Sequence, residues 1–232
     1  MRDHDVDTYF LSCAAKTLAI ENEETVFPIN RIFCVGRNYA AHAAEMGNEV
    51  DKETPFYFTV SPINASNGGQ VNYPDGTDDY HHEIEFVVAL GAPAYHIAQE
   101  NALDVVFGYG VGLDMTRRDL QAAAKEKRRP WDLGKDAEES AIFSPLVKKE
   151  AFGEIGNQTI SLEVNGEMRQ HSTLDKMVNS VPELIAHLSQ FYHLVPGDVI
   201  MTGTPEGVAN VERGDKLIGK VEGCPPVTAE FI

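Results

Sequence analysis

The stretch His81-His82-Glu83-Ile84-Glu85-Phe86-Val87-Val88-Ala89-Leu90 has the alternating pattern of a β-strand. Successive side chains of a strand point to opposite faces, so the apolar residues at every second position from Ile84 form a face that packs in a core. Glu83 and Glu85 then project together from the opposite face, with Cα atoms roughly 6.5 Å apart. Two neighbouring carboxylates repel each other, and a divalent cation between them would remove that cost. The alternative is that both lie on a solvated face of the strand.

Two histidines stand directly before this pair. Because His81 and His82 are adjacent, a strand would direct them to opposite faces, which argues against a shared zinc site. A structural role, or a hydrogen bond that orients a metal ligand, is favoured over direct coordination by either histidine.

A third acid, Asp114, ends an apolar, glycine-containing run that has the character of a buried strand. A helix is expected at 117–128, with Thr116 as its cap, so the acid stands where the strand opens into a loop. Together with Glu83 and Glu85 it would offer three hard oxygen ligands and leave positions for water and a chelating substrate, which suits Mg²⁺ or Mn²⁺. The alternative role for this aspartate is to assist in capping the helix.

Basic residues are concentrated at 117–135, which carries seven bases and three acids in a chain of net charge −17. Such a local inversion of charge points to an anionic substrate. Arg118 and Gln121 are three residues apart, hence on one helical face, and could together hold a carboxylate. The bases at 125–129 are instead expected to form a solvated helix end that interacts favourably with the helix dipole.

His42 and Glu45 form a second constellation, on a helix expected at 38–46 with Asn38 as its cap. Three residues apart, they can lie side by side, and the carboxylate would raise the basicity of the imidazole and fix its tautomer. Such a pair can deprotonate water near neutral pH. A surface contact is the commoner role of a helical His–Glu pair, so this function depends on a metal site nearby.

Short strands dominate the rest of the chain, which predicts one strand-rich α+β catalytic domain at 31–232, preceded by an acidic accessory segment at 1–30. Strands are expected at 32–35, 55–60, 82–90, 105–114, 161–164, 199–202, 216–222 and 227–232. The fifth of these leads into a hairpin turn at Asn165-Gly166. A further helix is expected at 181–191.

Composition excludes several classes of partner. The chain has 232 residues with 36 acids and 19 bases, so its field repels a phosphate backbone and nucleic acid is not an expected partner. The N-terminus lacks the basic character of a targeting peptide, and no apolar run is long enough to span a membrane. The cysteines Cys13, Cys34 and Cys224 show no disulfide or zinc spacing. We therefore expect a cytoplasmic protein without a membrane partner.

Several motifs in combination resemble the fumarylacetoacetate hydrolase family, in particular its small acylpyruvate and fumarylpyruvate hydrolase branch. They are CVGRNYAAHAAEM at 34–46, HHEIE at 81–85, GYGVGLDMTRRDLQ at 108–121, RPW at 129–131 followed by Lys135, VNGEMRQ at 164–170 and PGDVIMTGTPEGV at 196–208. The resemblance runs from about residue 28 to the end of the chain. It implies a mixed β-roll with flanking helices, commonly a homodimer.

The resemblance also implies roles for individual residues. The ligands of Mg²⁺, with Mn²⁺ or Ca²⁺ as substitutes, would be Glu83, Glu85 and Asp114. The catalytic residues would be His42, Glu45 and Lys135, and the residues that hold the substrate would be Arg118, Gln121 and Thr204. The implied activity is hydrolysis of the carbon–carbon bond of a 2,4-diketo acid, fumarylpyruvate or another acylpyruvate, to pyruvate and a carboxylic acid. Such a reaction belongs to aromatic catabolism.

Other activities fit the same site. An oxaloacetate decarboxylase or a keto acid isomerase could use the same metal ion, because each reaction passes through an enolate. Activation of water by His42 and Glu45 favours hydrolysis. A noncatalytic binding protein is the less favoured alternative.

Two departures from the family pattern bear on substrate preference. Family members often carry F-x-K-P near the edge of the active site, whereas residues 58–62 read FTVSP, so that lysine is missing. The usual F-D-x-S-A-P pattern after Lys135 is replaced by AEESAI at 137–142.

Overall fold

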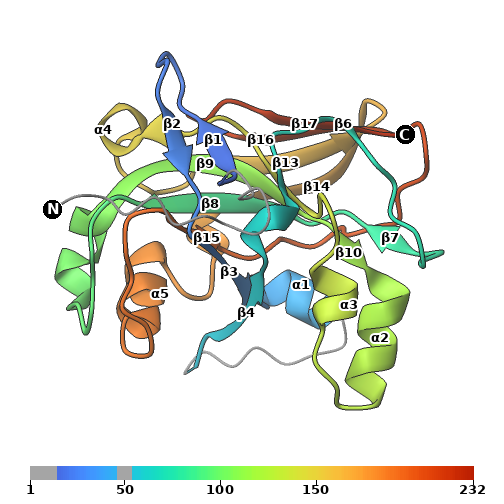
Figure 1. Cartoon of the computed structure of the whole chain (residues 1–232), viewed down its shortest axis with the longest axis horizontal. Helices are drawn as coiled ribbons and strands as arrows, with labels where there is room; N and C mark the ends of the chain where they lie inside the picture. Colours follow the sequence, from blue (N-terminus) through green and yellow to red (C-terminus); the bar gives the residue numbers. More distant parts are fainter. Residues whose placement is uncertain (1–14, 46–53) are drawn as a thin grey trace, which may run out of the picture.

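Two β-sheets, one above the other, organise the chain (Figure 1). This computed structural model describes residues 15–45 and 54–232. The larger sheet runs in the order β4 (Phe56–Val60), β3 (Arg31–Gly36), β15 (Asp198–Met201), β8 (Ile84–Leu90), β9 (Val106–Asp114), β11 (Ala141–Phe143) and β5 (Ala65–Ser66), with β12 (Val147–Lys148) also paired to β9. The smaller sheet runs in the order β14 (Glu167–Thr173), β13 (Thr159–Val164), β16 (Lys216–Val221), β17 (Val227–Phe231) and β6 (Gly69–Val71). The strand-rich α+β class is therefore confirmed.

β8 lies in the middle of the larger sheet, and every residue in it is buried. Phe86 and Val88 belong to a large apolar cluster that includes side chains of the smaller sheet, whereas Val87 and Ala89 belong to a second cluster. The alternation expected from the sequence is thus confirmed, but both faces of the strand are covered. The solvated-face alternative for the acids of this strand is wrong.

The expected strands are all present, with ends shifted by no more than two residues. The hairpin of β13 and β14 turns at Asn165 and Gly166, whose φ values of 54° and 82° are those of a type I′ turn. Both residue types adopt a positive φ at low cost, which is why this dipeptide predicts the hairpin.

The helices α1 (Ala40–Glu45), α2 (Arg118–Glu126) and α3 (Asp132–Lys135) lie together below β8 in Figure 1. α4 (Lys149–Phe152) and α5 (Val181–Leu188) lie elsewhere on the sheets. α5 begins with a capping box of Ser180 and Glu183 and ends three residues before the expected end. The expected end of the 38–46 helix lies outside the described residues.

Two side chains expected to cap helices have other partners. Asn38 is fully buried, and its Nδ2 donates to the carbonyls of Asn179 (3.0 Å) and Thr202 (2.8 Å). Thr116 lies in the short strand β10 (Thr116–Arg117) and donates to the Asp114 carbonyl. Buried backbone groups need partners, and these short polar side chains satisfy groups that belong to other segments.

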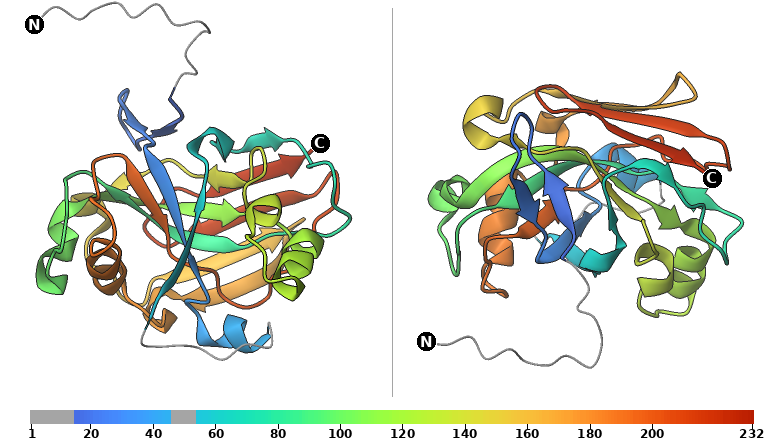
Figure 2. Two further views of the ribbon diagram at one scale, coloured as in Figure 1. Left: turned by 60° about the horizontal axis from the view of Figure 1, so that its bottom comes forward. Right: turned by 45° about the horizontal axis from the view of Figure 1, so that its top comes forward.

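The described part of the N-terminal segment forms a hairpin of β1 (Thr17–Ala19) and β2 (Val26–Pro28), which stands beside the larger sheet in Figure 2. Leu18 and Phe27 are buried in the second apolar cluster, so the hairpin is held by core contacts. The domain boundary at residue 30 stays a prediction.

Two of the three cysteines lie in the described residues. Cys34 and Cys224 are free thiols, and Cys13 lies outside the described residues. Within 15–45 and 54–232, no helix is long and apolar enough to cross a membrane.

Candidate active site

Glu83, Glu85 and Asp114 meet where β8 and β9 pair. The strands are antiparallel with Ile84 opposite Leu113, and the Asp114 N–H donates to the Glu83 carbonyl (2.9 Å). One carboxylate oxygen from each acid lies within 4.8 Å of the other two, and no acid is more than 5% exposed. The pairing of two strands that are neighbours in sequence therefore brings the three predicted ligands together.

Two cations contact this triad. Lys135 donates from Nζ to Glu83 Oε2 (2.6 Å) and Asp114 Oδ2 (2.8 Å), and Arg118 donates to Glu83 Oε1. Burial would raise the pKa of Glu83, but Lys135 and Arg118 hold it well below its usual range. Burial disfavours the charge of Lys135, but Asp114 and Glu83 raise its pKa. The lysine therefore stays charged and links two of the three carboxylates.

The donor set fits a divalent cation. Within the described residues, Asp114 Oδ1 is buried without a hydrogen-bond partner. Burial, followed by the charges of Asp114 and Glu83, raises the pKa of Glu85 well above its usual range, and burial raises the pKa of Asp114 to about 6. When all three acids are ionised, the triad and the two bases Lys135 and Arg118 carry one net negative charge. A divalent cation would turn it into one net positive charge, which suits an anionic substrate.

His42 and Glu45 lie side by side on α1. His42 Nδ1 is 3.4 Å from Glu45 Oε2, and both oxygens of Glu45 are 3.1 Å from the Gly207 N–H donor. Burial lowers the pKa of His42 from 6.5, against the opposing effect of Glu45. The imidazole is therefore neutral at neutral pH and can accept a proton.

This arrangement predicts the acid limb of a pH–rate profile. If His42 is the base, kcat/KM should rise with pH through a pKa below 6.5 and then level off, because only the neutral imidazole accepts a proton. Glu45→Gln should move the rise to lower pH, since the carboxylate raises the pKa of His42. A profile without an acid limb, or a limb that Glu45→Gln leaves in place, would contradict this role.

A loop at 202–207 holds acids of both constellations. The Gly203 N–H donates to Glu85 Oε2 (2.7 Å), and the Gly207 N–H donates to Glu45. The two glycines have φ values of 97° and 94°, and a Cβ at either one would lie within 2.7 Å of a neighbouring atom. A side chain is excluded at both positions, which accounts for the glycine spacing in TGTPEG.

Thr204, in the same loop, is oriented by the buried side chain of Gln170. Because Gln170 Oε1 accepts from the Ile84 N–H (3.1 Å), its Nε2 must donate to Thr204 Oγ1 (2.9 Å) and the Pro205 carbonyl (2.8 Å). The hydroxyl of Thr204, which lines the cavity, therefore keeps its own hydrogen to donate. His82 Nδ1 lies 3.0 Å from Gln170 Oε1 and must donate to it, and burial lowers the pKa of His82 to about 4.

Gln170→Met should weaken the binding of an anionic keto acid by about fivefold to tenfold, because the hydroxyl of Thr204 loses its fixed orientation. In a Thr204→Val background the same substitution should have little further effect. A double-mutant cycle on KM measures this coupling, and thermal unfolding checks that both variants fold. If the losses of affinity in the two single variants add up in the double variant, Gln170 does not act through Thr204.

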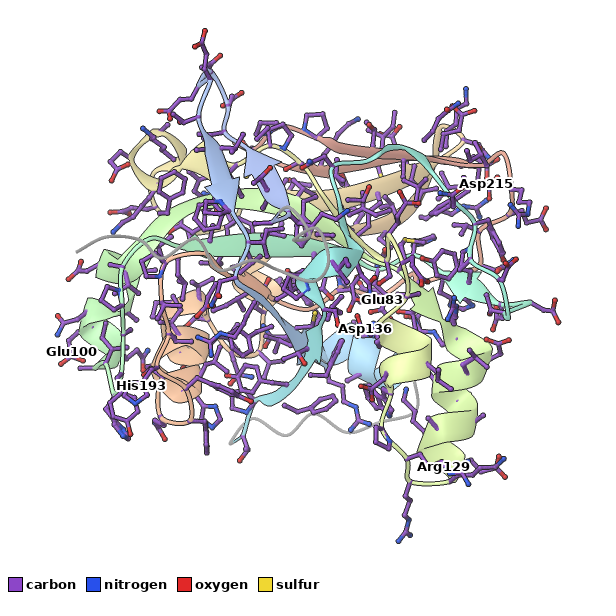
Figure 3. All side chains as sticks on the ribbon, in the orientation of Figure 1. Glu83, Glu100, Arg129, Asp136, His193 and Asp215 are labelled. Carbon is purple, nitrogen blue, oxygen red and sulfur yellow. The ribbon has the colours of Figure 1, made fainter. Side chains whose placement is uncertain are left out.

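The carboxylate triad and His42 line one open cavity. The predicted site residues in its wall are His42, Glu83, Glu85, Asp114, Arg118, Gln121, Lys135 and Thr204. Glu45 contacts the cavity residue His42, and Arg118 Nη1 donates to Gln121 Oε1 (2.8 Å). In Figure 3, Glu83 lies near the centre of the molecule, whereas Arg129 lies at its edge, beyond the end of α2.

The cavity wall also contains residues that the sequence analysis did not select: Arg37, Phe56, Phe58, Lys125 and Trp131. Phe56 and Phe58 share one face of β4, so strand alternation could have paired them. Lys125 was expected to belong to a solvated helix end, but it is half-buried. Lys125 follows Arg118 by seven residues and Gln121 by four, and this spacing could have predicted that the three side chains share one helical face.

The two segments that depart from the family pattern, 58–62 and 137–142, contact the backbone or side chains next to Lys135. Val60 is buried in the second apolar cluster and does not line the cavity. Ser61 donates from N (2.8 Å) and Oγ (2.6 Å) to the carboxylate of Asp136. Ser140 Oγ donates to the Lys135 carbonyl (3.1 Å). These contacts hold the backbone on both sides of the lysine.

The chain is similar to proteins of one family. Residues 31–231 match the family described as fumarylacetoacetate (FAA) hydrolase C-terminal. A fumarylpyruvate hydrolase from Ralstonia sp is 49% identical over 186 residues, which cover 79% of this chain and 96% of that protein. A mitochondrial oxaloacetate tautomerase from Arabidopsis thaliana is 40% identical over 197 residues, which cover 85% of this chain and 88% of that protein.

The fold agrees as well. The crystal structure of fumarylpyruvate hydrolase from Pseudomonas aeruginosa in complex with Mn²⁺ and pyruvate has a TM-score of 0.93 and 42% identity to this chain. The match covers 97% of this chain and 99% of that one. Since the sequence match spans the described core and the fold match spans nearly the whole chain, this protein belongs to the fumarylacetoacetate hydrolase family.

Proposed function

We propose that this chain is a divalent-metal-dependent hydrolase that cleaves the carbon–carbon bond of fumarylpyruvate, a 2,4-diketo acid, to give pyruvate and fumarate. The observation that carries the proposal is the meeting of a buried carboxylate triad and a His–Glu pair in one cavity. The relatives from Ralstonia sp and Pseudomonas aeruginosa, both named fumarylpyruvate hydrolase, support the choice of substrate.

The residues of the cavity divide the work of binding. Arg118 and Gln121 on one helical face, together with the hydroxyl of Thr204, hold the carboxylate of the pyruvate half. A divalent cation at the triad would supply a Lewis acid that stabilises negative charge on a nearby oxygen. The ammonium of Lys135 adds positive charge at the same place.

His42 performs the proton transfer. Its neutral imidazole, oriented by Glu45, takes a proton from water, and the water oxygen attacks the C4 carbonyl of the substrate. The C3–C4 bond then breaks, and its electron pair forms the enolate of pyruvate. The proton taken up by His42 is returned to C3, which gives pyruvate, and C4 keeps the oxygen of the water as a carboxyl group, which gives fumarate.

The proposal also covers the native metal ion, the oligomeric state, the location and the metabolic role. Mg²⁺ is the expected native ion because three carboxylates are hard oxygen ligands, and the Mn²⁺ in the Pseudomonas aeruginosa relative supports a site that accepts either ion. A homodimer, a cytoplasmic location and a place in aromatic catabolism are expected from the family resemblance.

A keto acid tautomerase is the second candidate, because the relative from Arabidopsis thaliana carries the name oxaloacetate tautomerase. Tautomerisation and hydrolysis share an enolate, so the triad and Lys135 serve either reaction. The His42–Glu45 pair favours hydrolysis because only hydrolysis needs an activated water.

The test follows the loss of diketo-enol ultraviolet absorbance of fumarylpyruvate and acetylpyruvate, beside oxaloacetate, with and without Mg²⁺. We expect Mg²⁺-dependent cleavage of a 2,4-diketo acid with equal amounts of pyruvate and the second acid. Turnover of oxaloacetate alone would support the tautomerase or decarboxylase instead. No turnover of any keto acid would favour a binding protein.

A further inference from the structure

Lys125 extends the charged face of α2 outward from the triad. Arg118, Gln121 and Lys125 follow one another at helical spacing and all line the cavity. Arg118 contacts a carboxylate of the triad and Gln121 contacts Arg118. Among residues 15–45 and 54–232, no acid lies within ion-pair distance of Lys125 Nζ, so its charge faces the cavity without a carboxylate partner.

The ammonium of Lys125 instead lies over an aromatic ring, with Nζ 4.9 Å from the centroid of Trp131. Burial, and next the charge of Arg118, lowers the pKa of Lys125 to about 8. A half-buried cation in such surroundings is stabilised by an anion that enters with the ligand.

Two aromatic side chains form a wall beside this lysine. Phe56 and Trp131 pack edge to face with centroids 5.1 Å apart. Arg37 also lines the cavity, with Cζ 6.0 Å from the centroid of Phe56. A flat apolar segment of a ligand fits against the rings, and a second negative charge fits beside the cations.

Distance along the helix matches the length of a diacid. At 1.5 Å per residue the Cα atoms of Arg118 and Lys125 are about 10.5 Å apart. The six carbon–carbon bonds of a seven-carbon diacid, each about 1.5 Å long, span roughly 7 to 8 Å as a zigzag. The flexible lysine side chain covers the difference.

Charge balance leads to the same class of ligand. With a divalent cation bound, the triad and its two bases carry one net positive charge, which one carboxylate neutralises. Lys125, with Arg37 in the same cavity wall, then leaves further positive charge for a second carboxylate. An acylpyruvate with an uncharged acyl group would leave this lysine uncompensated.

We propose that Lys125 binds the terminal carboxylate of a dicarboxylic acylpyruvate, while Phe56 and Trp131 pack against its flat unsaturated segment. This inference rests on the proposed function, since the triad must hold the pyruvate end. Lys125 is thus a specificity-determining residue that separates dicarboxylic from monocarboxylic substrates.

The test compares two ligands that cannot be hydrolysed, 2-oxoheptanedioate and 2-oxoheptanoate, which differ only in the terminal carboxylate. Calorimetry with Mn²⁺ present should show the diacid binding about tenfold more tightly to the wild-type protein. Lys125→Met should abolish that preference. Lys127→Met removes the same charge from an exposed residue outside the cavity and should retain it.

Equal affinity for both acids in the wild type, or a preference that survives Lys125→Met, would overturn the inference. Hydrolysis of fumarylpyruvate by the same preparations separates this inference from the proposed function. A preference for the diacid without hydrolysis would contradict the proposed function but support the role of Lys125. Hydrolysis together with an unchanged preference in Lys125→Met would support the proposed function but contradict the role of Lys125.

Discussion

His42→Ala is expected to lower kcat for fumarylpyruvate by about a thousandfold, because a positioned general base contributes on the order of a hundredfold to ten-thousandfold. The affinity for Mn²⁺ should change little, since His42 belongs to α1 and not to the carboxylate triad. Steady-state kinetics and calorimetric titration with Mn²⁺ measure the two effects separately.

His187 provides a matched control for this substitution. It lies on α5, stacks on Tyr57 and does not line the cavity, so His187→Ala should leave kcat within about threefold of the wild type. Full activity of His42→Ala would exclude His42 as the base. A parallel loss of Mn²⁺ affinity would instead assign it to the metal site.

Asp114→Asn is expected to weaken the binding of Mn²⁺ by about a hundredfold or more, because changes in groups that only support metal ligands already cost about tenfold to a hundredfold. Turnover should fall in proportion to the fraction of the protein that holds Mn²⁺. Since burial raises the pKa of Asp114, its charge opposes folding at neutral pH, and the metal-free variant should unfold at no lower temperature than the metal-free wild type.

Asp119→Asn removes an equal charge from the neighbouring helix α2. Asp119 accepts a hydrogen bond from Thr77 and does not line the cavity, so this variant should bind Mn²⁺ as the wild type does. Unchanged Mn²⁺ affinity in Asp114→Asn would show that the triad is not the metal site. A metal-free variant that does not fold would contradict the expected sign of the stability change.

The parts of the site that sequence could predict depend on local geometry. Strand alternation places Glu83 and Glu85 on one face, and helical spacing places Arg118 beside Gln121. The position of Asp114 beside these two acids could be predicted because β8 and β9 are neighbours both in sequence and in the sheet. Each inference needs only the repeat of one element or the pairing of consecutive strands.

The parts that sequence missed depend on contacts between distant segments. Gln170 orients Thr204 from the edge strand of the smaller sheet, and Asn38 binds Asn179 across 141 positions. No periodicity encodes such partners. The exposure of Lys125 likewise depends on how α3 and Trp131 pack against its helix, which a helical pattern alone does not determine.

The most direct test of metal-dependent hydrolysis is a titration of metal-stripped protein with Mn²⁺, with pyruvate and fumarate measured as they are released from fumarylpyruvate. Metal-dependent hydrolysis predicts one bound ion per chain, product release in proportion to the fraction of chains that hold an ion, and equal amounts of the two products. Full release of both products in the presence of a chelator, with no ion bound, would contradict it.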